Sequence, residues 1–252
     1  MTKIRSRILK KTFDPAGGAW DSGCTHGKKE HTHMKKTLVI AAAALTLGVL
    51  SASAQSNVYS LNIVGYVNVE LPTGYNLVAN PLDDGNGNVS SNLVPLSLPT
   101  GSQVLTYTPG LGYTISGKKA SGAWSPVVTI RPGNGFFVRN LGPAVTNTFV
   151  GNVAGAVPGS ISTNIAVGYN LMGSPYPIGG VFTNMGSNTM NFGDNMVVGS
   201  QVLTYANGLG YTTSGKKASG AWSPVTTINV GQGFFIRNLS NAPVAWTQNV
   251  GP

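Results

Sequence analysis

The sequence predicts an all-β protein of two tandem homologous β-sandwich-like modules that pack together, preceded by a signal peptide. Three observations predict this organisation. The chain contains a long internal repeat, its apolar residues occur in short alternating runs bounded by Gly, Pro and Asn, and an apolar leader lies near its N-terminus. No long stretch of the repeated part shows the 3.6-residue apolar period of a helix.

The internal repeat sets the domain boundaries. Residues 101–141 align without gaps on residues 199–239, and 33 of these 41 positions are identical. Upstream, GYNLVANPL at 74–82 resembles GYNLMGSPY at 168–176. We therefore expect one module at 58–152 and a second at 153–252. The junction between them is neither long nor rich in Pro and Ser, so the modules should pack against each other.

The leader at 34–54 has the three parts of a signal peptide. Met34 is followed by two lysines, residues 37–50 are apolar and uncharged, and Ala-Ser-Ala at 52–54 forms a small-residue cleavage site. Residues 1–33 fit neither a leader nor a folded element, and we interpret them as a disordered upstream extension that precedes the true start. The predicted location is the cell surface or the extracellular space, past the inner membrane.

Composition after the leader excludes several kinds of chemistry. The single Cys and all three His lie within residues 1–33, so the exported part lacks thiolate nucleophiles, Cys/His zinc sites and Ser-His-Asp triads. From residue 55 onward there are seven basic and four acidic residues, too few cations for a nucleic-acid-binding face. We therefore expect no catalytic residues, no metal, no cofactor, no nucleic-acid partner and no membrane span in the mature chain.

Four carboxylates remain for an alternative, carboxylate-dependent hydrolase: Glu70, Asp83, Asp84 and Asp194. None of them recurs between the two copies. The segment 83–88 alternates oxygen ligands as a calcium loop does, but Pro95 stands where an EF-hand needs its bidentate Glu. We interpret this segment as a polar turn.

A repeated hairpin provides the candidate binding residues. They comprise an aromatic pair and a lysine pair in each copy: Tyr113, Lys118, Lys119 and Trp124 in the first, and Tyr211, Lys216, Lys217 and Trp222 in the second. A Trp ring can stack on a sugar, and a lysine pair can attract an anionic polymer. The alternative is that the Trp caps the core edge while the lysines solvate the turn and block edge pairing.

Two further aromatic pairs have a structural interpretation. Consecutive residues of a strand point to opposite faces, so at least one ring of Phe136-Phe137 should enter the core. We expect the other to face the partner copy, the alternative being contact with a ligand. The same holds for Phe234-Phe235. For Tyr75 and Tyr169 we expect a packing role with the ring buried, the alternative being direct contact with a ligand.

The motifs GYNLVANPL, GYNLMGSPYP, PGNGFFVRN and GQGFFIRN resemble a module of secreted β-rich repeat proteins from Gram-negative bacteria. That module carries a G-[WFY]-N-L-x-x-N-P block followed by G-x-G-F-F-V. The resemblance implies export and a β-fold. It implies no activity and supplies no active-site residues.

Together these observations predict a secreted, non-enzymatic structural or adhesive protein of the cell surface or extracellular matrix. Its expected partners are copies of itself or an extracellular polysaccharide. The alternative is a carbohydrate-binding module that uses the Trp and Tyr residues of the repeated hairpins. The carboxylate-dependent hydrolase is the third hypothesis.

Overall fold

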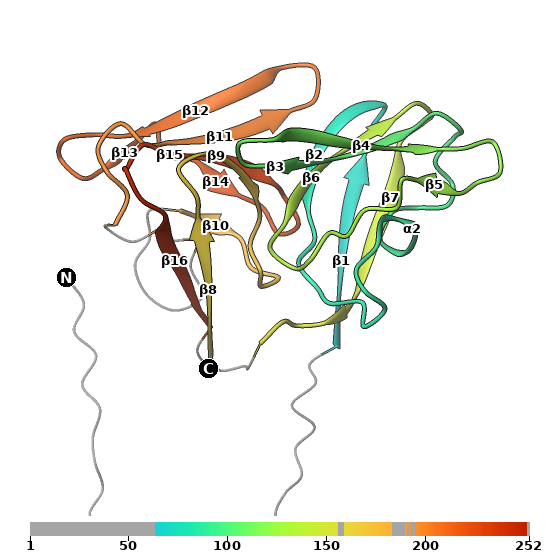
Figure 1. Cartoon of the computed structure of the whole chain (residues 1–252), viewed down its shortest axis with the longest axis horizontal. Coiled ribbons are helices and arrows are strands. Elements are labelled where there is room, and N and C mark those ends of the chain that lie inside the picture. The colour runs from blue at the N-terminus through green and yellow to red at the C-terminus, as the bar shows by residue number, and fades with distance from the viewer. Residues whose placement is uncertain (1–63, 156–158, 183–189, 191, 193–194, 251–252) are drawn as a thin grey trace, which may run out of the picture. The chain divides into compact units, whose positions relative to one another are not determined.

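The computed structural model describes residues 64–250, apart from 156–158, 183–189, 191 and 193–194 (Figure 1). The predicted leader at 34–54 and the extension at 1–33 lie outside the described residues. The described chain is nearly all β and contains two similar groups of antiparallel strands that pack together. This confirms the predicted fold class of two tandem homologous modules.

Module 1 consists of residues 64–152. Its elements are β1 (Val64–Leu71), β2 (Gly74–Ala79), α2 (Ser90–Leu93), β3 (Gln103–Thr108), β4 (Gly112–Lys118), β5 (Trp124–Ser125), β6 (Gly135–Asn140) and β7 (Val145–Asn152). Five strands form one antiparallel sheet in the order β2-β6-β3-β4-β5, and β1 pairs with β7 in a second sheet.

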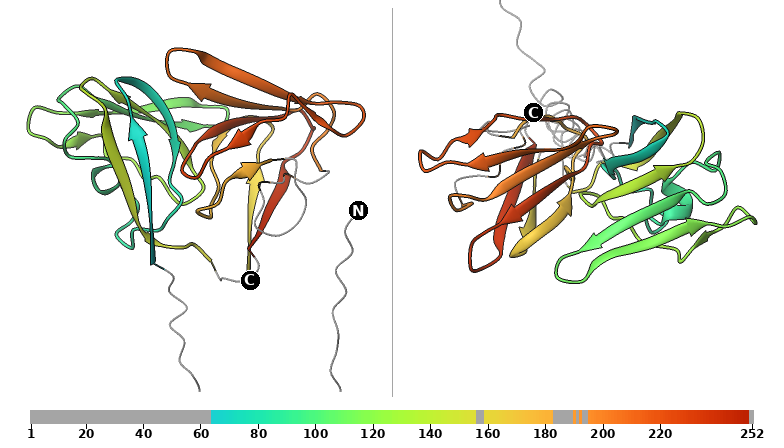
Figure 2. Two further views of the ribbon diagram at one scale, coloured as in Figure 1. Left: turned by 180° about the vertical axis from the view of Figure 1, so that it is seen from behind. Right: turned by 90° about the horizontal axis from the view of Figure 1, so that it is seen from above.

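Module 2 consists of residues 159–250 and repeats this plan. Its strands are β8 (Gly159–Ile165), β9 (Gly168–Met172), β10 (Gly180–Val181), β11 (Gln201–Ala206), β12 (Gly210–Lys216), β13 (Trp222–Ser223), β14 (Thr227–Ile228), β15 (Phe234–Asn238) and β16 (Val244–Val250). The five-stranded sheet has the order β13-β12-β11-β15-β9, β8 pairs with β16, and the short β10 pairs with β14. In Figure 2 the blue-to-green strands of module 1 form one group and the yellow-to-red strands of module 2 form another.

Strand alternation divides the side chains of each five-stranded sheet between two faces. Phe136 and Val138 of β6 enter the core of module 1, where Phe136 packs edge-on against Phe149 of β7. Phe137, between them, belongs to a separate buried cluster shared by both modules. The predicted division of the Phe-Phe pair between core and partner copy is confirmed.

The modules meet through equivalent contacts. The amide of Ala79 donates to the carbonyl of Gly231 at 2.8 Å, and the amide of Gly173 donates to the carbonyl of Gly133 at 2.9 Å. Position 79 aligns with 173 and position 133 with 231, so each hydrogen bond is the counterpart of the other. The junction therefore has approximate two-fold symmetry, like the self-complementary interface of a symmetric dimer.

Glycine allows this close approach of the two backbones. A Cβ added to Gly135 would lie 2.6 Å from the carbonyl oxygen of Met172, and one added to Gly233 would lie 2.5 Å from that of Val78. Both positions belong to the G-F-F blocks of the repeat. The recurring G-F-F block thus serves the module junction: its glycine admits the partner backbone, and the second Phe packs there.

Among the residues described, the structure contains no helix with the length and apolar character needed to cross a membrane.

Candidate binding groove at the module junction

The outer faces of the two five-stranded sheets form an aromatic groove at the junction. Its buried floor consists of Leu77, Phe137, Leu171 and Phe235, with Leu105, Tyr107, Leu203 and Tyr205 packed against it. Tyr107 of module 1 meets Phe235 of module 2 edge-on, with ring centroids 5.4 Å apart. Tyr205 meets Phe137 at the same separation. Each module thus inserts one tyrosine against the phenylalanine of the other.

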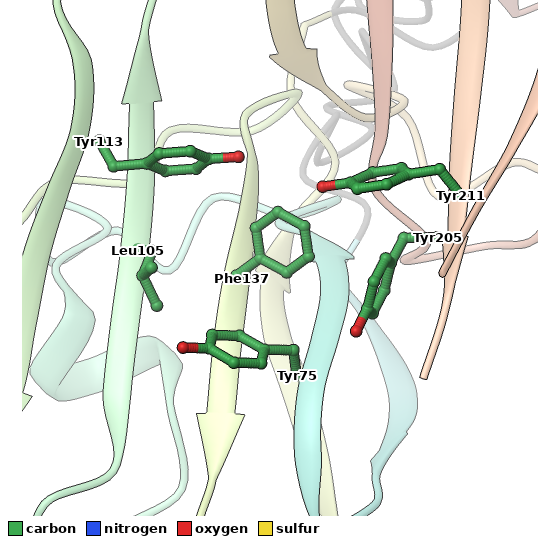
Figure 3. Close-up of a pocket in the computed structure, with 6 residues that line it drawn as sticks. All are labelled: Tyr75, Leu105, Tyr113, Phe137, Tyr205 and Tyr211. Carbon is green, nitrogen blue, oxygen red and sulfur yellow. The ribbon is translucent and has the colours of Figure 1, made fainter. Parts of the chain in front are cut away.

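The aromatic groove contains two hollows, each of about 260 Å³. The first is lined by Tyr75, Leu105, Tyr113, Phe137, Tyr205 and Tyr211 (Figure 3). The second is lined by the equivalent residues Tyr169, Leu203, Tyr211, Phe235, Tyr107 and Tyr113. The two-fold symmetry of the junction therefore produces two matching sites from one repeated sequence.

Tyr113 and Tyr211 line both hollows and separate one from the other. Their hydroxyl groups point toward each other (Figure 3). Burial is the main cause that raises the pKa of each hydroxyl above the usual tyrosine value. The interaction of Tyr113 with Tyr211 raises the pKa of Tyr113 further. Both rings are nevertheless about half exposed, at 47% and 49%, so a ligand can reach them.

Tyr75 and Tyr169 are more open than the sequence suggested. Their exposed fractions are 38% and 39%, whereas we expected buried rings. Each packs edge-on against the phenylalanine of its own sheet, Phe137 or Phe235, at 6.3 Å between centroids. Because β2 and β9 are the edge strands of their sheets, one side of each ring stays uncovered. The structure thus places both tyrosines in the groove wall.

An arginine stands beside each of these tyrosines. Arg139 pairs with Tyr75 across β6 and β2, and its guanidinium carbon lies 5.5 Å from the ring centroid. Arg237 and Tyr169 repeat this arrangement at 5.3 Å. At these distances the ring attracts the guanidinium through a cation–π contact.

Two polar hollows of about 330 Å³ each lie next to the aromatic groove and are also equivalent to each other. One includes Tyr205 and is lined by side-chain amides such as Asn68 and Asn207 together with the carboxylate of Glu70. The other has Asn164 at the position that aligns with Glu70. Asp83 and Asp84 lie in a separate loop, and Asp194 lies outside the described residues.

The repeated hairpins hold their tryptophans inside the modules. Trp124 and Trp222 belong to the hydrophobic cores and expose only 3% and 6% of their surfaces. Stacking on a sugar requires an open ring face, which neither residue presents. Their position agrees with the alternative interpretation, in which these rings close the edge of the core.

Each lysine pair is divided between inside and outside. Lys118 and Lys216 are buried, whereas Lys119 and Lys217 are exposed at the hairpin. The ammonium group of Lys118 donates to the carbonyl oxygen of Leu98 at 2.7 Å and also to that of Leu96. Only the second lysine of each pair is therefore placed to attract a polymer.

The segment 83–88 folds as a polar turn. Asp84 accepts hydrogen bonds from the backbone amides of Asn86 and Asn88, both at 2.8 Å. The Gly85 amide, followed by the Asn88 side chain, lowers the pKa of Asp83. The carboxylates are thus satisfied by the turn itself. Within the described part of the chain, no three His, Cys, Asp or Glu side chains gather as metal ligands would.

The fold and the groove define a two-module antiparallel β-protein with a symmetric aromatic site between its modules. No protein-family model matches the chain, and no curated protein or solved structure matches it either.

Several groove residues could not be selected from the sequence. Tyr113 and Tyr211 were among the predicted binding residues and do line the hollows. Tyr107 and Tyr205 were not singled out, although their recurrence in the repeat was visible. Recurrence alone does not distinguish them from core residues, because a repeat conserves its core as well as its sites.

Proposed function

We propose that this protein is an exported, non-enzymatic adhesive protein of the cell surface or extracellular matrix that binds a polysaccharide in its aromatic groove. The observation that supports this proposal is the pair of equivalent tyrosine-lined hollows at the module junction. Sugar binding was the alternative prediction from the repeated hairpins. In the present proposal the tyrosines of those hairpins bind the sugar, because the tryptophans are buried.

The chemistry of the groove suits a sugar ring. A pyranose presents C–H-rich faces that pack on aromatic rings and hydroxyl groups that exchange hydrogen bonds with tyrosine hydroxyls. Tyrosine has few rotatable bonds, so ordering it on a ligand costs little conformational entropy. A mostly apolar hollow with a few polar groups is also the usual composition of a ligand site.

The presence of two equivalent hollows supports an adhesive role. Two linked sites that engage one polymer strengthen binding through effective concentration, even where each site alone is weak. Self-association remains a separate prediction for the same protein, since strand edges can pair between copies. Native mass measurement over a range of protein concentrations tests it.

The test of sugar binding uses affinity electrophoresis of the full chain in gels that contain one polysaccharide each, neutral and acidic. We expect Tyr113→Ala combined with Tyr211→Ala to weaken binding roughly tenfold or more, from the loss of two aromatic contacts. Tyr66→Ala is the matched control, because Tyr66 is 74% exposed on β1 and lines neither hollow.

Retention by a polysaccharide that is lost in the double variant and kept in the control would support the proposal. If no polysaccharide retards the chain, or if both variants bind like the parent, the groove is not a sugar site. Circular dichroism of the variants shows whether the fold is retained, as the exposure of these rings leads us to expect.

A further inference from the structure

We infer that the ligand of the aromatic groove is an acidic polysaccharide, with carboxylate groups that bind Arg139 and Arg237. This inference rests on the proposed function and names the class of polymer. It is carried by the position, charge and geometry of these two arginines.

Both arginines lie on the groove side of their sheets. Arg139 is two residues along β6 from Phe137, so both side chains project from the same face. Arg139 is also the cross-strand partner of Tyr75, which lines the first hollow. Arg237 stands in the same relation to Phe235 and to the second hollow. Each guanidinium therefore lies beside a tyrosine that lines one of the hollows.

Among the residues that the structure describes, no carboxylate pairs with either of these positive charges. The described acidic residues are Glu70, Asp83 and Asp84, and the structure shows no ion pair between any of them and either arginine. Arg237 makes one side-chain hydrogen bond, to the amide oxygen of Gln201 at 3.4 Å. A guanidinium has five N–H donors, so most remain available to a ligand.

The contact with tyrosine places each guanidinium where a carboxylate of the ligand can reach it. Each guanidinium carbon lies over a tyrosine ring, 5.5 or 5.3 Å from the ring centroid, and this cation–π attraction helps to hold the charge beside the hollow. A carboxylate can then accept two parallel hydrogen bonds, which are stronger than neutral ones. A uronic acid satisfies both parts of the site, because its ring packs on tyrosine and its carboxylate reaches arginine.

The experiment compares two polymers that share one backbone. Polygalacturonate carries a carboxylate on each sugar, and its fully methyl-esterified form offers the same ring faces without the charge. Binding of the full chain to each is measured by isothermal titration calorimetry at low and at high salt. We expect roughly tenfold tighter binding of the acid form at low salt, with the advantage reduced by salt.

Arginine variants identify the residues responsible. Arg139→Gln combined with Arg237→Gln should remove the preference for the acid form, so that the acid and the ester bind with similar affinity. Lys119→Gln combined with Lys217→Gln is the matched control. It removes the same two charges from exposed hairpin positions and should keep the preference.

The outcomes separate this inference from the proposed function. Equal binding of acid and ester, or a preference that survives the arginine variant, overturns the acidic-ligand inference and leaves sugar binding intact. A preference lost in the lysine variant instead places the acid site on the hairpins and also overturns it. If neither polymer nor any other polysaccharide binds, both proposals fail.

Discussion

Module 1 and module 2 share the strands of the repeated block but fill their cores with different side chains. Apart from Phe149, the segments around the block in module 1 contribute aliphatic residues to its core, among them Leu71, Leu82 and Leu98. Those of module 2 contribute aromatic rings such as Phe192 and Trp246, whose centroids lie 4.8 Å apart. The same type of five-stranded sheet therefore packs against aliphatic residues in one module and against aromatic rings in the other.

The junction between the modules shows the opposite behaviour. There the two copies use the same large side chains, with Phe137 matching Phe235 and Tyr113 matching Tyr211. A core tolerates substitution as long as volume and apolar character are kept. A self-complementary interface tolerates less, because the same residue types have to fit each other twice, as Tyr107 fits Phe235 and Tyr205 fits Phe137. The comparison teaches that the repeat preserves the junction more strictly than the cores.

The largest expected effect comes from the aromatic core of module 2. Trp246 is 1% exposed, and Trp246→Ala should lower the free energy of unfolding by about 3–5 kcal/mol. Because the modules share a buried junction, we expect one unfolding transition that moves as a whole to lower temperature. Calorimetry and near-ultraviolet circular dichroism measure it. Two separate transitions would show that the modules unfold independently.

A smaller effect tests the symmetry axis itself. A Cβ at Gly173 would lie 2.0 Å from that of its counterpart Ala79, so the junction has room for only one of these methyl groups. Gly173→Ala should therefore cost about 1–3 kcal/mol through overpacking. Adding Ala79→Gly should restore most of that loss. Chemical denaturation of the two single variants and the double variant gives the coupling energy, and purely additive effects would contradict this view of the axis.

The smallest effect is the pH dependence of the tyrosine pair. Burial raises the pKa of Tyr113, so this residue stays protonated in the folded protein above about pH 10, where an unfolded tyrosine ionises. The unfolded state then binds fewer protons, and stability should fall as pH rises through that range. Tyr113→Phe should lose less stability over the same interval. Chemical denaturation at several pH values measures this. If the free energy of unfolding falls equally with pH in the parent and in Tyr113→Phe, the raised pKa of Tyr113 is not the cause.

Part of the site could be read from the sequence, because strand alternation is a local property. Alternation along the strand predicts that Phe136 and Phe137 lie on opposite faces, and the structure confirms that Phe136 lies in the core and Phe137 at the junction. Repetition drew attention to Tyr113 and Tyr211. The same reasoning could not separate Lys118 from Lys119 by role, because the difference depends on the carbonyl oxygens of Leu96 and Leu98 in a distant loop.

The sequence by itself determined the β-class, the duplication and the alternation of side chains, because each depends on residue types at fixed spacing along one chain. Only the tertiary structure decided which tyrosines meet across the junction, that Trp124 faces inward, and that Arg139 lies beside the groove residue Tyr75. These relations join strands of different modules or depend on which face of a sheet is covered. Neither is encoded by local spacing, so both required the packing of the two sheets.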